Sequence, residues 1–219
     1  SNPGKAFEKE YSDSKYTGDW KDGILYLRLG ENRRIQQLTK SLPLFTDRRV
    51  PSRKTICLSN EEAQPIYDIL APIFQSIHGY PLRPGTFPME YRVYQPNSKG
   101  MDWHRDLQMY RPAQVEMVYT VFNHDSNTRF EWKDRSGKIQ SVQPKAGDLV
   151  MVKPNGPMHR VTGLGKGTRG ILKIVGYPAD ATALPSKYLE SSMCPRRKPS
   201  WVLLLLCGVV VCIIWMSIN

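Results

Sequence analysis

Residues 144–177 read PKAGDLVMVKPNGPMHRVTGLGKGTRGILKIVGY, and this stretch decides the fold class. Its short β-prone runs at 149–153, 159–162 and 170–177 are separated by segments rich in glycine and proline. Runs of this length with frequent turn signals are typical of β-strands. The stretch therefore predicts closely spaced strands of a β-sandwich or barrel.

The same pattern of strands and turns continues toward the N-terminus. Strands are predicted at 23–29, 89–94 and 115–122, and a hairpin with a polar turn is predicted over 129–142. The protein is therefore expected to be mainly β, with one long helix followed by about seven or eight short strands.

That helix is predicted at 59–78, before most of the strands. Ser59 is a typical N-cap, acidic residues follow in the first turn, and apolar residues then recur at helical spacing. Gly79 is a typical helix stop, whereas Pro65 and Pro72 are expected to limit or kink the helix. The amphipathic pattern indicates a helix that packs against the β-strands.

The two ends of the chain differ from this central region. Residues 201–218 read WVLLLLCGVVVCIIWMSI, carry no charge and are long enough as a helix to span a bilayer. The basic cluster at 195–198 predicts a C-terminal tail anchor with the preceding domain in the cytosol, at the endoplasmic reticulum, the outer mitochondrial membrane or a viral membrane. We expect a flexible leader at 1–22, without a signal peptide, and a basic linker at 181–200.

Composition excludes some classes of protein and leaves others open. The 219 residues are 40% hydrophobic and 23% charged, which excludes a wholly disordered chain or a collagen-like repeat. The formal net charge of +11 belongs entirely to residues 1–200 and suits either anionic lipid or nucleic acid. The four cysteines show no zinc-finger spacing, and their positions do not indicate a disulfide framework.

Two polar residues in the segment DWHRD could bind a metal. His104 and Asp106 are separated by one residue, so in a strand their side chains would project from the same face. One further histidine would complete the two-histidine, one-carboxylate triad that binds Fe(II) and leaves coordination positions open. His159, at the end of a predicted strand, is our candidate for the third ligand.

Arg169 follows His159 by ten residues and is a candidate carboxylate-binding residue. The glycine-rich segment 163–167 predicts a hairpin turn between the strands that carry these two residues. Such a hairpin would bring both side chains to the same mouth of the barrel. A guanidinium group is a planar, bidentate donor suited to a carboxylate.

The order His104-x-Asp106, His159 and then Arg169 resembles the 2-oxoglutarate/Fe(II)-dependent oxygenases, and in particular their prolyl and lysyl hydroxylase branch. The resemblance covers roughly residues 59–178 and implies a double-stranded β-helix, or jelly-roll, core at about 88–178 within a domain at 23–180. It implies that His104, Asp106 and His159 bind Fe(II) and that Arg169 binds the distal carboxylate of 2-oxoglutarate.

The resemblance also suggests two tyrosines for the co-substrate pocket. Tyr94 lies ten residues before His104, where some family members place such a tyrosine, and Tyr119 is expected to point inward by strand alternation. The segment HDSNTRF at 124–130 departs from the family, because many members have a Gly-Gly-x-Thr sequence there. That departure concerns a loop and does not involve the expected metal ligands.

The activity implied is hydroxylation of a protein or peptide side chain, of prolyl or lysyl type, coupled to decarboxylation of 2-oxoglutarate to succinate. Fe(II), 2-oxoglutarate and O2 would be required, with ascorbate as a further candidate cofactor. Two alternatives remain open at this point. The first is an AlkB-like oxidative nucleic-acid demethylase, which the positive charge favours, and the second is a catalytically silent, membrane-tethered binding module.

Overall fold

The computed structural model describes residues 8–10, 20–47, 50–81 and 87–184. The predicted tail anchor at 201–218 lies outside these residues, as do most of the predicted leader and most of the basic linker. Within the described part of the chain, no helix combines the length and the apolar character required to cross a membrane.

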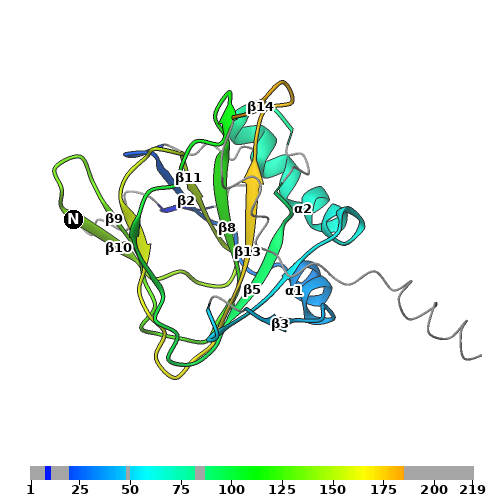
Figure 1. The fold of residues 1–219 in the computed structure, drawn as a ribbon, viewed down its shortest axis with the longest axis vertical. Coiled ribbons are helices and arrows are strands. Elements are labelled where there is room, and N and C mark those ends of the chain that lie inside the picture. Colours follow the sequence, from blue (N-terminus) through cyan, green and yellow to red (C-terminus); the bar gives the residue numbers. More distant parts are fainter. Residues whose placement is uncertain (1–7, 11–19, 48–49, 82–86, 185–219) are drawn as a thin grey trace, which may run out of the picture.

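Two antiparallel-rich sheets form the body of the protein (Figure 1). The larger sheet has eight strands in the order β1 (Glu8–Glu10), β2 (Ile24–Arg28), β11 (Asp148–Val152), β8 (Val115–Asn123), β13 (Arg169–Gly176), β5 (Glu90–Tyr94), β4 (Arg53–Cys57) and β3 (Phe45–Thr46). The smaller sheet has four strands in the order β10 (Ile139–Val142), β9 (Phe130–Lys133), β12 (His159–Val161) and β6 (Met101–His104). A separate pair joins β7 (Tyr110–Arg111) to β14 (Thr182–Ala183).

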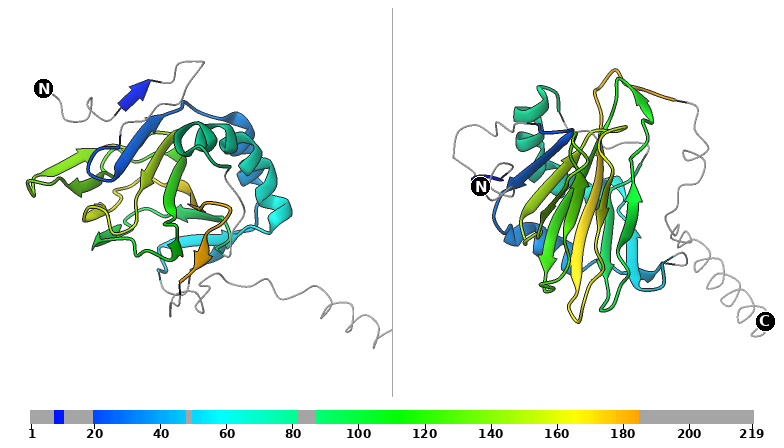
Figure 2. Two further views of the ribbon diagram at one scale, coloured as in Figure 1. Left: turned by 90° about the horizontal axis from the view of Figure 1, so that it is seen from above. Right: turned by 90° about the vertical axis from the view of Figure 1, so that its left-hand side faces the viewer.

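Both helices pack on the same side of the larger sheet, opposite the β9–β10 hairpin (Figures 1 and 2). Helix α2 (Asn60–His78) begins with a capping box between Ser59 and Glu62 and ends at Gly79, which is left-handed at φ 74°. The predicted limits of this helix are confirmed, and it continues through Pro65 and Pro72. Helix α1 (Arg33–Lys40) was not predicted from the sequence.

The hydrophobic core has two parts, one on each face of the larger sheet. Alternate residues of β8, among them Met117 and Tyr119, pack with Phe74 of α2 on the helix side. The other part lies between the two sheets and includes Tyr26, Trp132 and Val150. Because successive side chains of a strand point to opposite faces, the remaining residues of β8 are directed toward the space between the sheets.

The observed architecture confirms the prediction of a mainly β jelly-roll fold with flanking helices. One predicted connection is wrong, because the segment 163–167 is not a hairpin turn. β12 pairs with β6 and β9 in the smaller sheet, whereas β13 pairs with β5 and β8 in the larger one. The glycine-rich segment therefore crosses from one sheet to the other. Cys57, at the end of β4, is disulfide-bonded, which the spacing of the cysteines had not indicated.

Candidate metal centre and co-substrate cavity

The antiparallel pairing of β6 with β12 brings two histidines together. His104, the last residue of β6, is the register partner of His159, the first residue of β12. Their ring centroids are 4.3 Å apart. The carboxylate of Asp106 lies 3.9 Å from Nε2 of His104 and 3.4 Å from Nε2 of His159. The three residues each offer one ligand atom within 4.8 Å of the others, as a shared metal ion requires.

Backbone carbonyl groups orient both imidazole rings toward Asp106. Nδ1 of His104 lies 2.7 Å from the carbonyl oxygen of Asp102, and Nδ1 of His159 lies 3.1 Å from that of Pro157. In a neutral ring, Nδ1 then donates to the carbonyl and Nε2 keeps its lone pair. This is the usual arrangement of a metal-binding histidine and its backbone partner.

The protonation state of His159 also suits a ligand. Burial lowers the pKa of His159, although Asp106 opposes this effect, so the neutral ring is favoured near neutral pH. Two imidazoles and one carboxylate on one side of a cavity match the donor set of non-haem Fe(II) sites. The residues present therefore fit Fe(II).

The cluster faces a cavity of about 450 Å³ between the two sheets. Arg169 lies in the lining of the same cavity, together with Tyr94. The remaining walls are largely apolar and include Phe130, Val150, Val152, Val161 and Leu164. These apolar walls border the space between the metal-binding residues and Arg169.

Arg169 is the buried cation of this cavity and lacks a carboxylate partner among the described residues. Its side chain is 3% exposed, its Nη2 lies 3.4 Å from Oγ1 of Thr120, and its Nε has no hydrogen-bond partner within the described part of the chain. Burial lowers the pKa of Arg169. A buried guanidinium group without a carboxylate partner is electrostatically unfavourable. A carboxylate ligand would supply the missing partner.

The two predicted pocket tyrosines have different positions. Tyr94 is the register partner of Arg169 and lines the cavity. Burial raises the pKa of Tyr94, but Arg92, Arg53 and Arg169 outweigh this effect, so the net shift is downward. Tyr119 does not line the cavity, because it points to the helix side of β8 and belongs to the core there. Its neighbours Glu116 and Val118 occupy the cavity-facing positions.

Sequence reasoning missed several residues beside the metal-binding cluster. Glu116, Lys173 and Arg92 line the large cavity and also a second cavity of about 250 Å³, which Asp106 borders as well. Strand alternation within β13 was a usable signal, because Arg169 and Lys173 are four residues apart and share a face. The partners of Lys173 lie on β8 and β5, and one sequence does not reveal that pairing.

The carboxylate of Asp125 links the loop at 124–130 to a distant segment of the chain. Asp125 accepts hydrogen bonds from the backbone N–H groups of Asn127 and Thr128 in its own loop. It also accepts from those of Gly165 and Gly167, at 2.8 and 3.1 Å, in the crossing segment between β12 and β13. A Cβ atom at Gly167 would lie 2.3 Å from the carbonyl oxygen of His124, so the two backbones require glycine there. Asp125 therefore fixes the connection between His159 and Arg169.

We expect Asp125→Asn to lower the free energy of unfolding by about 2 to 3 kcal/mol near pH 7, because an amide NH2 replaces one oxygen that accepts two backbone hydrogen bonds. Burial alone would raise the pKa of Asp125, but its four backbone hydrogen bonds lower it. Its contribution is therefore present above the ordinary aspartate pKa and is lost as the pH falls through the lowered value. Urea unfolding at several pH values should show the difference between wild type and variant shrinking in acid. Asp68→Asn is the control, since exposed Asp68 accepts a side-chain hydrogen bond from Gln64. An unchanged stability in Asp125→Asn would contradict this role.

No protein-family model matches the chain, and no curated protein matches its sequence. Solved structures do match its fold. SnoK, a non-haem α-ketoglutarate-dependent carbocyclase from nogalamycin biosynthesis, has a TM-score of 0.61 at 12% identity, over 81% of this chain and 88% of SnoK. HygX from Streptomyces hygroscopicus, with nickel, 2-oxoglutarate and hygromycin B bound, has a TM-score of 0.55 at 13% identity, over 73% and 84%.

A prolyl-4-hydroxylase from Pseudomonas putida is similar to a comparable extent. Its TM-score is 0.51 at 15% identity, over 72% of this chain and 94% of that protein. At such low identity these likenesses establish the fold. The chain has the fold of the 2-oxoglutarate/Fe(II)-dependent oxygenases, and it carries a His-Asp-His cluster in its cavity that is consistent with Fe(II) and 2-oxoglutarate.

Proposed function

We propose that this protein is an Fe(II)- and 2-oxoglutarate-dependent oxygenase that hydroxylates a protein side chain of prolyl or lysyl type, with decarboxylation of 2-oxoglutarate to succinate. One observation carries the proposal. The cluster of His104, Asp106 and His159 faces the same cavity as Arg169, a buried cation with no carboxylate partner in the described part of the chain.

Each of these residues has a defined task in the proposed reaction. His104, Asp106 and His159 would hold Fe(II), which supplies the O2 chemistry that side chains lack. Arg169 would bind the distal carboxylate of 2-oxoglutarate, and Tyr94 lies beside it as its register partner. The apolar walls keep water away from the reacting groups.

The hydroxylase part of the proposal is supported by sequence spacing. The solved structures with this fold include a carbocyclase, an epimerase and a prolyl-4-hydroxylase, so the fold alone does not select the reaction. The ten-residue interval between His159 and Arg169 resembles the prolyl and lysyl hydroxylase branch and favours a side-chain substrate.

The proposal is tested by offering the protein a peptide library with Fe(II), 2-oxoglutarate and O2. We expect prolyl or lysyl peptides to gain the mass of one oxygen atom, with one succinate formed per modified residue. Methylated single-stranded oligonucleotides are the comparison, because a nucleic-acid demethylase would demethylate them. The affinity of a demethylase for these oligonucleotides would also fall steeply with added salt. Modification of oligonucleotides but not peptides would contradict the proposed substrate class.

We also propose that residues 201–218 anchor the protein in a membrane, with its catalytic domain in the cytosol. The uncharged sequence of this segment and the basic cluster before it support the proposal. In isolated membranes, protease added from the cytosolic side should digest the domain. Recovery of the protein in the fraction without membranes, or protection of the domain from protease, would contradict the proposal.

A further inference from the structure

We propose that the smaller cavity beside Asp106 is the substrate site, and that Glu116 recognises a primary amine carried on an unbranched apolar stem, as in a lysyl side chain. This inference rests on the proposed function, because it assumes that the substrate must reach the metal centre. It selects the lysyl over the prolyl alternative and names the residue that discriminates between them.

The position of the smaller cavity suits a substrate. Its volume is about 250 Å³, and Asp106, Glu116, Lys173 and Arg92 line both it and the larger cavity. It is not lined by Arg169 or by either histidine of the cluster. A molecule here would border the metal-binding residues without occupying the space between them and Arg169, where 2-oxoglutarate is expected.

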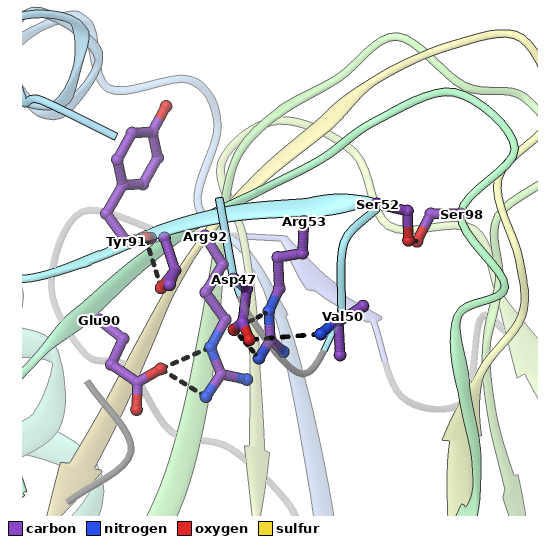
Figure 3. Close-up of polar contacts among 9 residues, drawn as sticks. Asp47, Val50, Ser52, Arg53, Glu90, Tyr91, Arg92 and Ser98 are labelled. Atoms are coloured by element: carbon purple, nitrogen blue, oxygen red, sulfur yellow. Dashed lines mark hydrogen bonds and ion pairs between the residues drawn. The ribbon is translucent and has the colours of Figure 1, made fainter. Parts of the chain in front are cut away.

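Two arginines that line this cavity already form ion pairs with carboxylates of the protein. Arg53 forms a close ion pair with Asp47, and Nε of Arg92 donates to Glu90 at 2.7 Å. Figure 3 shows both guanidinium groups on the same side of the sheet, with Tyr91 directed to the opposite side. These two arginines are therefore committed to their own carboxylates and are poor candidates for binding a substrate anion.

Glu116 is 5% exposed and forms an ion pair with Lys173, whose Nζ lies 3.4 Å from Oε2. This contact leaves Oε2 without a hydrogen bond among the described residues. A buried carboxylate oxygen without a hydrogen bond is costly, so a donor from a ligand would be strongly favoured. Oε2 of Glu116 is thus a buried acceptor without a hydrogen bond, as Nε of Arg169 is a buried donor without one.

The other walls of the small cavity indicate which chemical group would carry the hydrogen-bond donor to Glu116. Pro88, Met109 and Val175 give the small cavity apolar walls, and Leu107 is an exposed apolar side chain in its lining. An unbranched apolar stem would contact these groups while its polar end reached Glu116. An ammonium group is a stronger donor to a carboxylate than a hydroxyl group of the same reach. A pyrrolidine ring offers no side-chain donor and would leave Glu116 unsatisfied.

The test measures binding to the chain of residues 1–219 in detergent, without O2 and with Fe(II) and 2-oxoglutarate present. The probes are Nα-acetyl amides of lysine, 6-hydroxynorleucine, norleucine, proline and glutamate, titrated by calorimetry. We expect the lysine probe to bind most tightly. Glu116→Gln should weaken the lysine probe by about tenfold to a hundredfold and leave norleucine unchanged. Glu131→Gln is the matched control, because Glu131 pairs with Arg160 and lines neither cavity.

Several outcomes would overturn the inference. Equal binding of the lysine and norleucine probes to the wild type would exclude amine recognition, and this comparison needs no variant to fold. A preference for hydroxynorleucine, proline or glutamate, or full lysine affinity in Glu116→Gln, would also refute it. Failure of the proposed function is distinguishable, because it appears in the same samples as absence of the visible Fe(II)–2-oxoglutarate absorption band, whichever probe binds.

Discussion

We expect His159→Ala to abolish Fe(II) binding and 2-oxoglutarate turnover. The substitution removes one of the three ligands, and the remaining pair, His104 and Asp106, comes from a single chain segment. Loss of a mere hydrogen-bond partner of a metal ligand typically costs about 10- to 100-fold in affinity, and loss of the ligand itself should cost more. Anaerobic titration of Fe(II) and succinate release measure the two effects.

The matched control for this experiment is His124→Ala. His124 has an exposed imidazole in the loop after β8 and does not belong to the His104, Asp106 and His159 cluster. This variant should retain Fe(II) binding and 2-oxoglutarate turnover. Its comparison with His159→Ala distinguishes the removal of a metal ligand from the removal of a histidine elsewhere in the protein. Wild-type affinity for Fe(II) in His159→Ala would show that the three residues do not form a metal site.

Arg169→Gln is expected to weaken 2-oxoglutarate binding by about a hundredfold or more, because it leaves a carboxylate of the co-substrate buried without its cation. The same change should leave the unfolding midpoint without co-substrate unchanged or higher. The guanidinium group of Arg169 has no carboxylate partner in the described part of the chain, so its burial is unfavourable in the free protein. Calorimetric binding and thermal unfolding report the two effects separately.

These opposite responses distinguish a binding residue from a structural one. A structural arginine would lose stability on substitution, with or without the co-substrate. Arg129→Gln provides the control, because Arg129 is exposed and outside both cavities. If Arg169→Gln bound 2-oxoglutarate as tightly as the wild type, the assignment of this residue to the distal carboxylate would be incorrect.

Much of the metal-binding cluster was readable from the sequence because local geometry determines it. His104 and Asp106 are two residues apart at the end of a strand, so strand alternation alone predicts their proximity. The helix at 60–78 could also be predicted from the sequence, since Ser59 and Gly79 mark its two ends. Arg169 reaches the expected cavity, although by a crossing between sheets and not by the predicted hairpin.

Features that depend on strand order were not readable. The direction of Tyr119 follows from which face of β8 meets the helices, and a single strand pattern with both faces buried does not reveal it. The pairing of Glu116 with Lys173 requires β8 and β13 to be neighbours across a separation of more than fifty residues. Asp125 likewise acts through the segment at 163–167, which no local pattern connects to it.

The most direct test of the central claim is the anaerobic visible spectrum of the purified protein with Fe(II) and 2-oxoglutarate, followed by admission of O2 and assay of succinate. We predict a weak metal-to-ligand absorption band that forms only with both additions, and succinate once O2 is admitted. Both signals should be absent in His159→Ala. No band at saturating Fe(II) and 2-oxoglutarate would contradict the oxygenase proposal and would favour a catalytically silent binding module with this fold.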